Sequence, residues 1–203
     1  MESKTLRDIA LTYSECLIEK SKNGDNKAFG KLVGLWFKRI YNFSLKYFND
    51  HDQAMESTQK TFISVYKNIR KLKETKSFKL WLYKIALNQC HEEERRAKRR
   101  PWYSILQSED VFVKVEPHLD PEKQYNRHER EEILMDMIQM LPEEQRTILI
   151  MKEYEGLKFR EIAESLGISE NTAKSRLYYG LKGLKKSFEE HHLNLESIHY
   201  GNE

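Results

Sequence analysis

A chain of 203 residues with 35 Lys and Arg against 32 Asp and Glu has a formal net charge of only +3, so binding to nucleic acid would need local basic clusters. Charged residues make up 33% of the chain and hydrophobic residues 39%, with few Gly and Pro, which predicts an all-α fold of two small helical domains. Cys16 and Cys90 lack metal-ligand spacing and no apolar run approaches a membrane span, so we expect a cytoplasmic protein with no metal site and no membrane insertion.

The first domain is expected over residues 24–100, after a polar lead-in over residues 1–23 whose role the sequence does not indicate. Apolar residues at steps of three and four predict one long helix from Asp25 to Phe48. A second helix is predicted from about Gln53 to Leu72, after a polar interruption. Its apolar residues would face inward, and its outward residues would be Glu56, Gln59, Lys60 and Lys67.

A third helix is predicted to begin at Phe78, after a polar loop over residues 73–77. Its expected buried residues are Leu82, Ile85, Ala86 and Gln89, and residues 95–100 form a basic run. Trp81 and Tyr83 stand beside Lys84, and aromatic rings next to cations can stack on unpaired bases while the cations hold phosphates. Aromatic residues at helical spacing are more often part of a core, so the pattern alone leaves both interpretations open.

Residues 101–126 indicate an acidic linker between the two helical domains. Pro117 and Pro121 interrupt any regular period, and five acidic residues stand against two lysines. Two interpretations stay open for this segment. It is either a disordered tether or an extended strand that occupies a basic groove on a partner.

The second domain is expected over residues 127–190, followed by a polar tail over residues 191–203. A short helix from Arg127 would precede another that begins near Pro142 and is ended by Gly156. The most specific signal follows. It is an apolar face at i, i+3, i+4 and i+7, formed by Phe159, Ile162, Ala163 and Leu166.

This apolar helix must stop at Leu166, because Gly167 can close a helix in the left-handed conformation and Ser169 can cap the next one. The next helix would bury Ala173, Leu177, Leu181, Leu184 and Phe188. It is rich in Lys and Arg, which a duplex phosphate backbone attracts, and the start of such a second helix meets base edges in the major groove. The sequence therefore predicts a helix-turn-helix. The alternative is a packing module whose basic face is only solvated.

With both halves taken together, the chain resembles the bacterial RNA polymerase sigma factors of the extracytoplasmic-function (ECF) type, which keep only the second and fourth sigma domains. In the first domain the resemblance rests on GDNKAFGKLV (residues 24–33), AMESTQKTFISVYKNI (54–69) and FKLWLYKIALNQ (78–89). In the second domain it rests on residues 141–177. It implies a sigma factor that binds core RNA polymerase, directs it to promoter DNA and assists melting, without catalysis or a cofactor.

The resemblance also implies roles for individual residues. Docking on core polymerase would involve Glu56, Gln59 and Lys60. The minus-ten element, with its flipped base, would be met by Lys76, Ser77, Trp81, Lys84, Asn88, Glu92, Arg95 and Arg96. The upstream, minus-thirty-five element would be met by Glu170, Asn171, Lys174, Ser175, Arg176 and Tyr178. A cognate anti-sigma factor is a further expected partner, and the linker would thread toward the RNA exit channel.

The chain departs from the family pattern at two places. Lys60 stands where many relatives have an acidic residue, and Tyr179 and Gly180 stand where an Arg-Ala pair is usual.

Two other classes of function compete with a sigma factor. A helix-turn-helix regulator would bind duplex DNA without polymerase. An enzyme would have only the run Cys90-His91-Glu92-Glu93-Glu94 in its favour, and helical geometry separates those side chains around the helix.

Overall fold

The computed structural model describes residues 13–99 and 121–200, with side chains over 13–97 and 131–190. Throughout these ranges the regular elements are helical, which confirms the expected all-α fold. None of the helices described is long and apolar enough to cross a bilayer. The chain forms two compact units, Met1–Arg95 and Arg96–Glu203.

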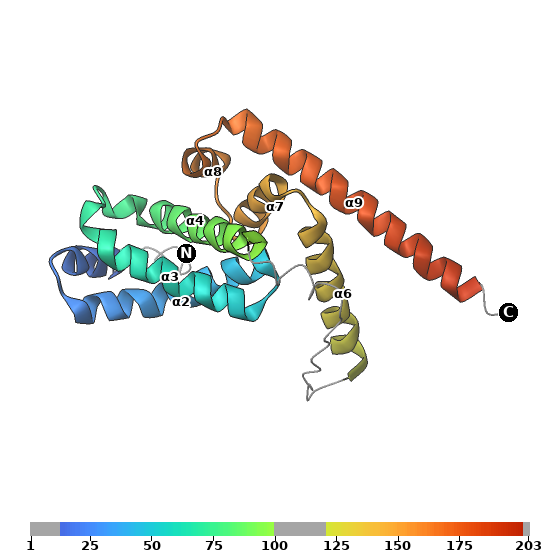
Figure 1. Cartoon of the computed structure of the whole chain (residues 1–203), viewed down its shortest axis with the longest axis horizontal. Helices are drawn as coiled ribbons and strands as arrows, with labels where there is room; N and C mark the ends of the chain where they lie inside the picture. The colour runs from blue at the N-terminus through green and yellow to red at the C-terminus, as the bar shows by residue number, and fades with distance from the viewer. Residues whose placement is uncertain (1–12, 100–120, 201–203) are drawn as a thin grey trace, which may run out of the picture. The chain divides into compact units, whose positions relative to one another are not determined.

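The first unit is built on three helices, α2 (Asn26–Phe48), α3 (His51–Asn68) and α4 (Phe78–Arg99), which run side by side in Figure 1. Asp25 caps α2 by accepting hydrogen bonds from the backbone N–H groups of Lys27 and Ala28, at 2.9 and 3.0 Å. These bonds, chiefly the one from Ala28, hold the pKa of Asp25 below its ordinary value.

The turn between α2 and α3 is short because two residues end one helix and start the other. Asn49 adopts the left-handed conformation at a φ of 52°, and its N–H donates to the Leu45 carbonyl. Asp50 then accepts the Gln53 N–H at 2.8 Å. This cap starts α3 at His51, earlier than the predicted Gln53.

A seam of small side chains lets α2, α3 and α4 approach closely. Ser44, Ser57 and Cys90 come one from each helix and are all fully buried. The Cys90 thiol lies 3.4 Å from the Ser57 hydroxyl and 3.8 Å from the Ser44 hydroxyl. Larger rings fill the rest of the core. Phe43 and Tyr83 meet edge to face at 5.5 Å between ring centroids.

Part of the lead-in belongs to this unit. Residues 13–22 are helical, and Leu17 and Ile18 are buried. The Trp36 indole of α2 donates to the Ser14 hydroxyl at 3.4 Å. This end of the lead-in therefore adds to the core of the first unit, a role that its polar sequence did not indicate.

The second unit contains α6 (Pro121–Met140), α7 (Glu143–Leu149), α8 (Phe159–Leu166) and α9 (Glu170–Tyr200). A π-helical turn, Ile150–Tyr154, continues α7. The core of the second unit includes Ile148, Leu149, Ile150, Met151, Leu157, Ile162, Ala163, Ala173 and Leu177. The Arg146 guanidinium ties α7 to α6, because it donates to the Gln139 side chain at 3.1 Å and its carbonyl at 3.3 Å.

The turn between α8 and α9 has the predicted chemistry. Gly167 lies in the left-handed region with a φ of 66°, and its N–H donates to the Ala163 carbonyl. The Ser169 hydroxyl accepts the Thr172 N–H at 3.0 Å and so caps α9. The helix-turn-helix prediction is confirmed at both residues.

Several sequence expectations differ from the structure. α6 begins at Pro121 and not at Arg127, because a proline without an N–H suits a first helical turn. α9 continues to Tyr200, through most of the expected polar tail. Of the expected linker over residues 101–126, residues 101–120 lie outside the described residues and the rest belong to α6.

Five side chains predicted to be buried are more exposed than their spacing suggested, and Leu184 of α9 is one of them, being half-buried. Leu181 and Phe188 are 47% and 52% exposed, because the apolar stripe of α9 extends beyond the part of the helix that packs against the other described helices. Ile85 and Gln89 of α4 are half-buried, and Tyr83 and Leu87 are buried instead. The predicted face of α4 was therefore rotated from the real one.

Candidate nucleic-acid and protein interfaces

The start of α9 presents a polar row to solvent. Five predicted residues are exposed: Glu170, Asn171, Lys174, Ser175 and Tyr178. At about 100° per residue these positions lie within an arc of roughly 140°, opposite the buried Ala173. This row has the width and position that a recognition helix uses in a major groove.

Arg176, the sixth predicted residue, faces another way. Its guanidinium forms an ion pair with Glu144 of α7 at 2.6 Å, and its side chain is only 26% exposed. Arg176 therefore connects α9 to α7 within the unit. In this structure it supports the exposed row and is not part of it.

Lys174 is held by a residue that the sequence argument placed only in the core. The Phe159 ring of α8 is half-buried and lies between two ammonium groups, Lys152 Nζ at 5.0 Å and Lys174 Nζ at 5.9 Å from its centroid. An aromatic face attracts cations by its quadrupole. Phe159 therefore links the first helix of the motif to the basic row of the second. Its spacing with Ile162 gave no signal of this role.

The outer face of α4 gathers the residues that the resemblance assigned to the minus-ten element. Lys84, Asn88, Arg95 and Arg96 are exposed, and Trp81 and Glu92 are half-buried. Their positions follow steps of three and four, which places them within an arc of about 120° on one side of the helix. Lys76 and Ser77 are exposed in a 3₁₀ turn, Thr75–Ser77, directly before α4. We name these eight residues, six on one side of α4 and two in the turn before it, the α4 stripe.

The two aromatic residues near this stripe have different surroundings. Tyr83 is 1% exposed, so for this ring the core interpretation is confirmed. Trp81 keeps part of its surface open while its ring lies 6.1 Å from Phe78, which is buried and contacts Trp36 at 5.7 Å. Of the two rings, only Trp81 can offer a face to a base.

The outward row of α3 mixes acidic and apolar side chains. Glu56 and Gln59 are exposed, as predicted. Met55 and Ile63 lie on the same side and are 38% and 54% exposed. Sequence reasoning missed these two, although an apolar residue at an outward helical position is a detectable signal. We call Glu56, Gln59, Met55 and Ile63 the α3 row.

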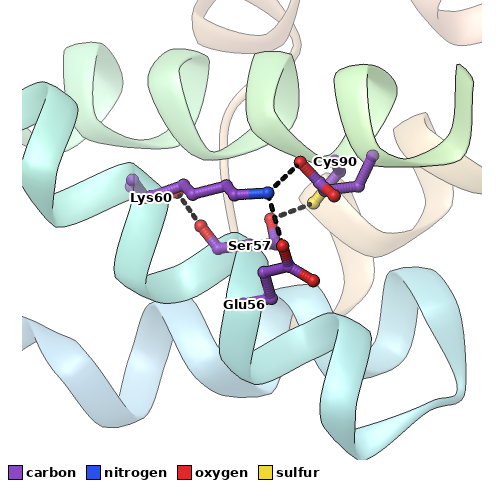
Figure 2. A network of polar contacts seen from close by, with 6 residues as sticks. Glu56, Ser57, Lys60 and Cys90 are labelled. Carbon is purple, nitrogen blue, oxygen red and sulfur yellow. Dashed lines mark hydrogen bonds and ion pairs between the residues drawn. The ribbon is translucent and has the colours of Figure 1, made fainter. Parts of the chain in front are cut away.

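Lys60 lies at the edge of this row, between α3 and α4. Its ammonium contacts Glu56 of its own helix and Glu93 of α4, both at 2.6 Å, as the dashed lines in Figure 2 show. Burial is the largest single effect and lowers the pKa of Lys60. The hydrogen bonds to Glu56 and Glu93 and the charges of these two groups together raise it by more, so the pKa lies above its ordinary value. The resulting stabilisation is present at neutral pH and is lost only as the pH rises through that raised pKa.

The run from Cys90 to Glu94 does not form a catalytic cluster. The Cys90 thiol is buried against Ser57 and Ser44. Glu93 pairs with Lys60, and Glu94 accepts a hydrogen bond from the Tyr47 hydroxyl at 2.8 Å. Three members of the run therefore have structural partners on α2 and α3. Within the described residues, no group of three or more His, Cys, Asp or Glu side chains could hold a metal ion.

Comparison with known families also divides the chain into two parts. The pattern of "Sigma-70 region 2" matches residues 32–100, and that of "Sigma-70, region 4" matches residues 131–184. The chain is 29% identical over 178 residues to the RNA polymerase sigma-H factor of Pseudomonas aeruginosa, covering 85% of this chain and 92% of that one. It is 31% identical over 169 residues to the ECF RNA polymerase sigma-E factor of Haemophilus influenzae, covering 81% and 89%.

Two solved structures share the fold. One is CnrH in complex with the cytosolic domain of CnrY, with a TM-score of 0.65 and 17% identity over 88% of this chain and 98% of that one. The other is the sigma factor RpoE in complex with the anti-sigma factor NepR from Bartonella quintana, with a TM-score of 0.61 and 20% identity over 80% and 98%.

Proposed function

The chain belongs to the ECF RNA polymerase sigma factors of the sigma-70 family, and we propose how its surfaces divide the work of such a factor. A sigma factor binds core RNA polymerase and directs it to promoters. Here the α3 row docks on core polymerase, the α4 stripe receives the minus-ten element, and the exposed row of α9 reads the upstream element. The protein works in the cytoplasm and is not an enzyme.

The observation that carries this assignment is the α4 stripe. Basic and amide groups stand beside the partly open ring of Trp81, on the side of α4 away from Cys90, Glu93 and Glu94. A surface with a stacking ring next to phosphate-binding cations suits a single strand better than a duplex. A regulator that binds only duplex DNA through a helix-turn-helix would not require such a surface. The alternative function therefore leaves the α4 stripe unexplained.

In the second unit, Asn171 and Ser175 lie nearest to bases, and Lys174 contacts phosphate. Arg176 holds α9 against α7 through Glu144.

The domain limits that we propose are 24–100 for the polymerase and minus-ten domain and 127–190 for the upstream-element domain. A cognate anti-sigma factor is a further proposed partner, supported by the complexes of RpoE and CnrH with their partners.

The first prediction is that the α3 row controls transcription by core polymerase. Core enzyme supplemented with this chain should give promoter-specific transcripts, and core enzyme alone should not. Glu56→Lys with Gln59→Lys should weaken core binding about tenfold or more, because it removes the acidic residue of the α3 row and places two cations there. Core affinity and run-off transcription are measured, with Glu164→Lys on α8, which adds positive charge to the other unit, as the control. Unchanged core affinity, with helicity intact by circular dichroism, would reject the α3 row as the docking site.

The second prediction is that Lys174 contacts phosphate and Arg176 does not. Lys174→Ala should reduce holoenzyme affinity for all upstream sequences and flatten the salt dependence by about one unit, because one phosphate contact is lost. Arg176→Ala should leave the slope nearly unchanged, since its guanidinium faces Glu144. Promoter binding by holoenzyme is titrated at several salt concentrations. Equal loss of slope in both variants would show that Arg176 leaves Glu144 and binds phosphate.

The third prediction concerns promoter opening through the α4 stripe. Ser77→Ala with Asn88→Ala should reduce open-complex formation while upstream binding stays intact, since pocket and stacking contacts contribute about 1–3 kcal/mol per base. Permanganate reactivity of thymines near the start site measures the opening. A template with a premelted bubble is the control: rescue indicates a role in strand separation, and a persisting defect indicates base capture. Full reactivity of the variant on both templates would show that the α4 stripe has no role in opening and is only a solvated surface.

A further inference from the structure

Lys60 is a cation at the edge of the α3 row, in which Glu56 is the one charged residue and has the opposite sign. The start of α3 carries Asp50, Asp52 and Glu56, and Lys60 is the first cation along the helix. A surface with this charge fits a basic partner. An unshielded cation here would weaken such an encounter.

The two ion pairs of Lys60 are unequal. Both contacts are 2.6 Å long, but the Glu93 side chain is 11% exposed and the Glu56 side chain is 57% exposed. Removing the cation from a carboxylate as buried as that of Glu93 is costly, whereas an exposed pair four residues apart on one helix contributes little. Lys60 is therefore anchored on Glu93 of α4, and its bond to Glu56 is the one that a partner can replace.

This asymmetry gives Lys60 two effects on the α3 row. Through Glu93 it fixes the outer edge of α3 to α4 at a point one turn beyond the Cys90 contact with Ser57. Through Glu56 it occupies the acidic group that a basic partner would need (Figure 2). We propose that Lys60 is a positioning residue that ties α3 to α4 and competes with core polymerase for Glu56, which lowers docking affinity. The inference rests on the proposed docking of the α3 row.

The test compares variants of the full-length chain in equilibrium binding to core RNA polymerase. Lys60→Met leaves Glu93 without its cation and can destabilise the unit, so Lys60→Met with Glu93→Gln is the main variant, and thermal melting checks its fold. Lys60→Arg keeps the charge and is the matched control. Glu56→Gln removes the group for which Lys60 and the partner compete.

The expected result is tighter binding by Lys60→Met/Glu93→Gln, by about twofold, which is what an exposed ion pair four residues apart on one helix gives. The gain should shrink as the ionic strength rises, and Lys60→Arg should bind like the unaltered chain. In a Glu56→Gln background the same double substitution should give no gain, because no carboxylate is released.

Equal or weaker binding by a folded Lys60→Met/Glu93→Gln chain would overturn the inference. Weaker binding would show that Lys60 itself contacts core polymerase, and equal binding would show that it has no effect on docking. A gain that persists in the Glu56→Gln background would also overturn it. The docking assignment fails differently. In that case Glu56→Gln and Glu56→Lys/Gln59→Lys both bind core polymerase as tightly as the unaltered chain.

Discussion

The attachment of α4 to α2 and α3 around Cys90 determines which side of α4 is left exposed, and this is the side that we propose for DNA. Cys90 enters the buried seam with Ser44 and Ser57, and one turn later Glu93 and Glu94 reach Lys60 and Tyr47. Positions 90, 93 and 94 share one side of a helix, so the α4 stripe necessarily occupies the opposite side. The α3 row and the α4 stripe therefore belong to one packed body, so the proposed docking on polymerase would also position the surface proposed for the melted strand.

In the second unit, local backbone chemistry and one long-range ion pair serve a similar purpose. Gly167 and Ser169 set the angle at which α9 begins, and Arg176 fastens that helix to Glu144 of α7. Gly180 fits the same packing. It is buried, and a Cβ added there would lie 3.4 Å from the Gln145 Cβ, an ordinary contact distance. The departure from the family's Arg-Ala pair is thus compatible with the close approach of α7 and α9.

Much of this architecture could be predicted from the sequence because it depends on local rules. Helical period placed α2, α3 and α8, and cap chemistry placed Gly167 and Ser169. The partners of Lys60 and Arg176 could not be predicted, because Glu93 and Glu144 are distant in sequence and either cation could equally have faced solvent. Periodicity also marked Leu181 and Phe188 as inward without showing where their packing partners end. The exact residues of the functional surfaces stay predictions.

Native-state hydrogen exchange on the free chain tests the central claim that α3 and α4 form one body. The amides of α3 and those around residues 86–94 of α4 should exchange through the same cooperative opening, with equal free energies. Glu93→Gln combined with Glu94→Gln should lower both together. If the amides of residues 86–94 exchange through a smaller, separate opening while α3 stays protected, α4 is not held by the contacts around Cys90 and the account is wrong.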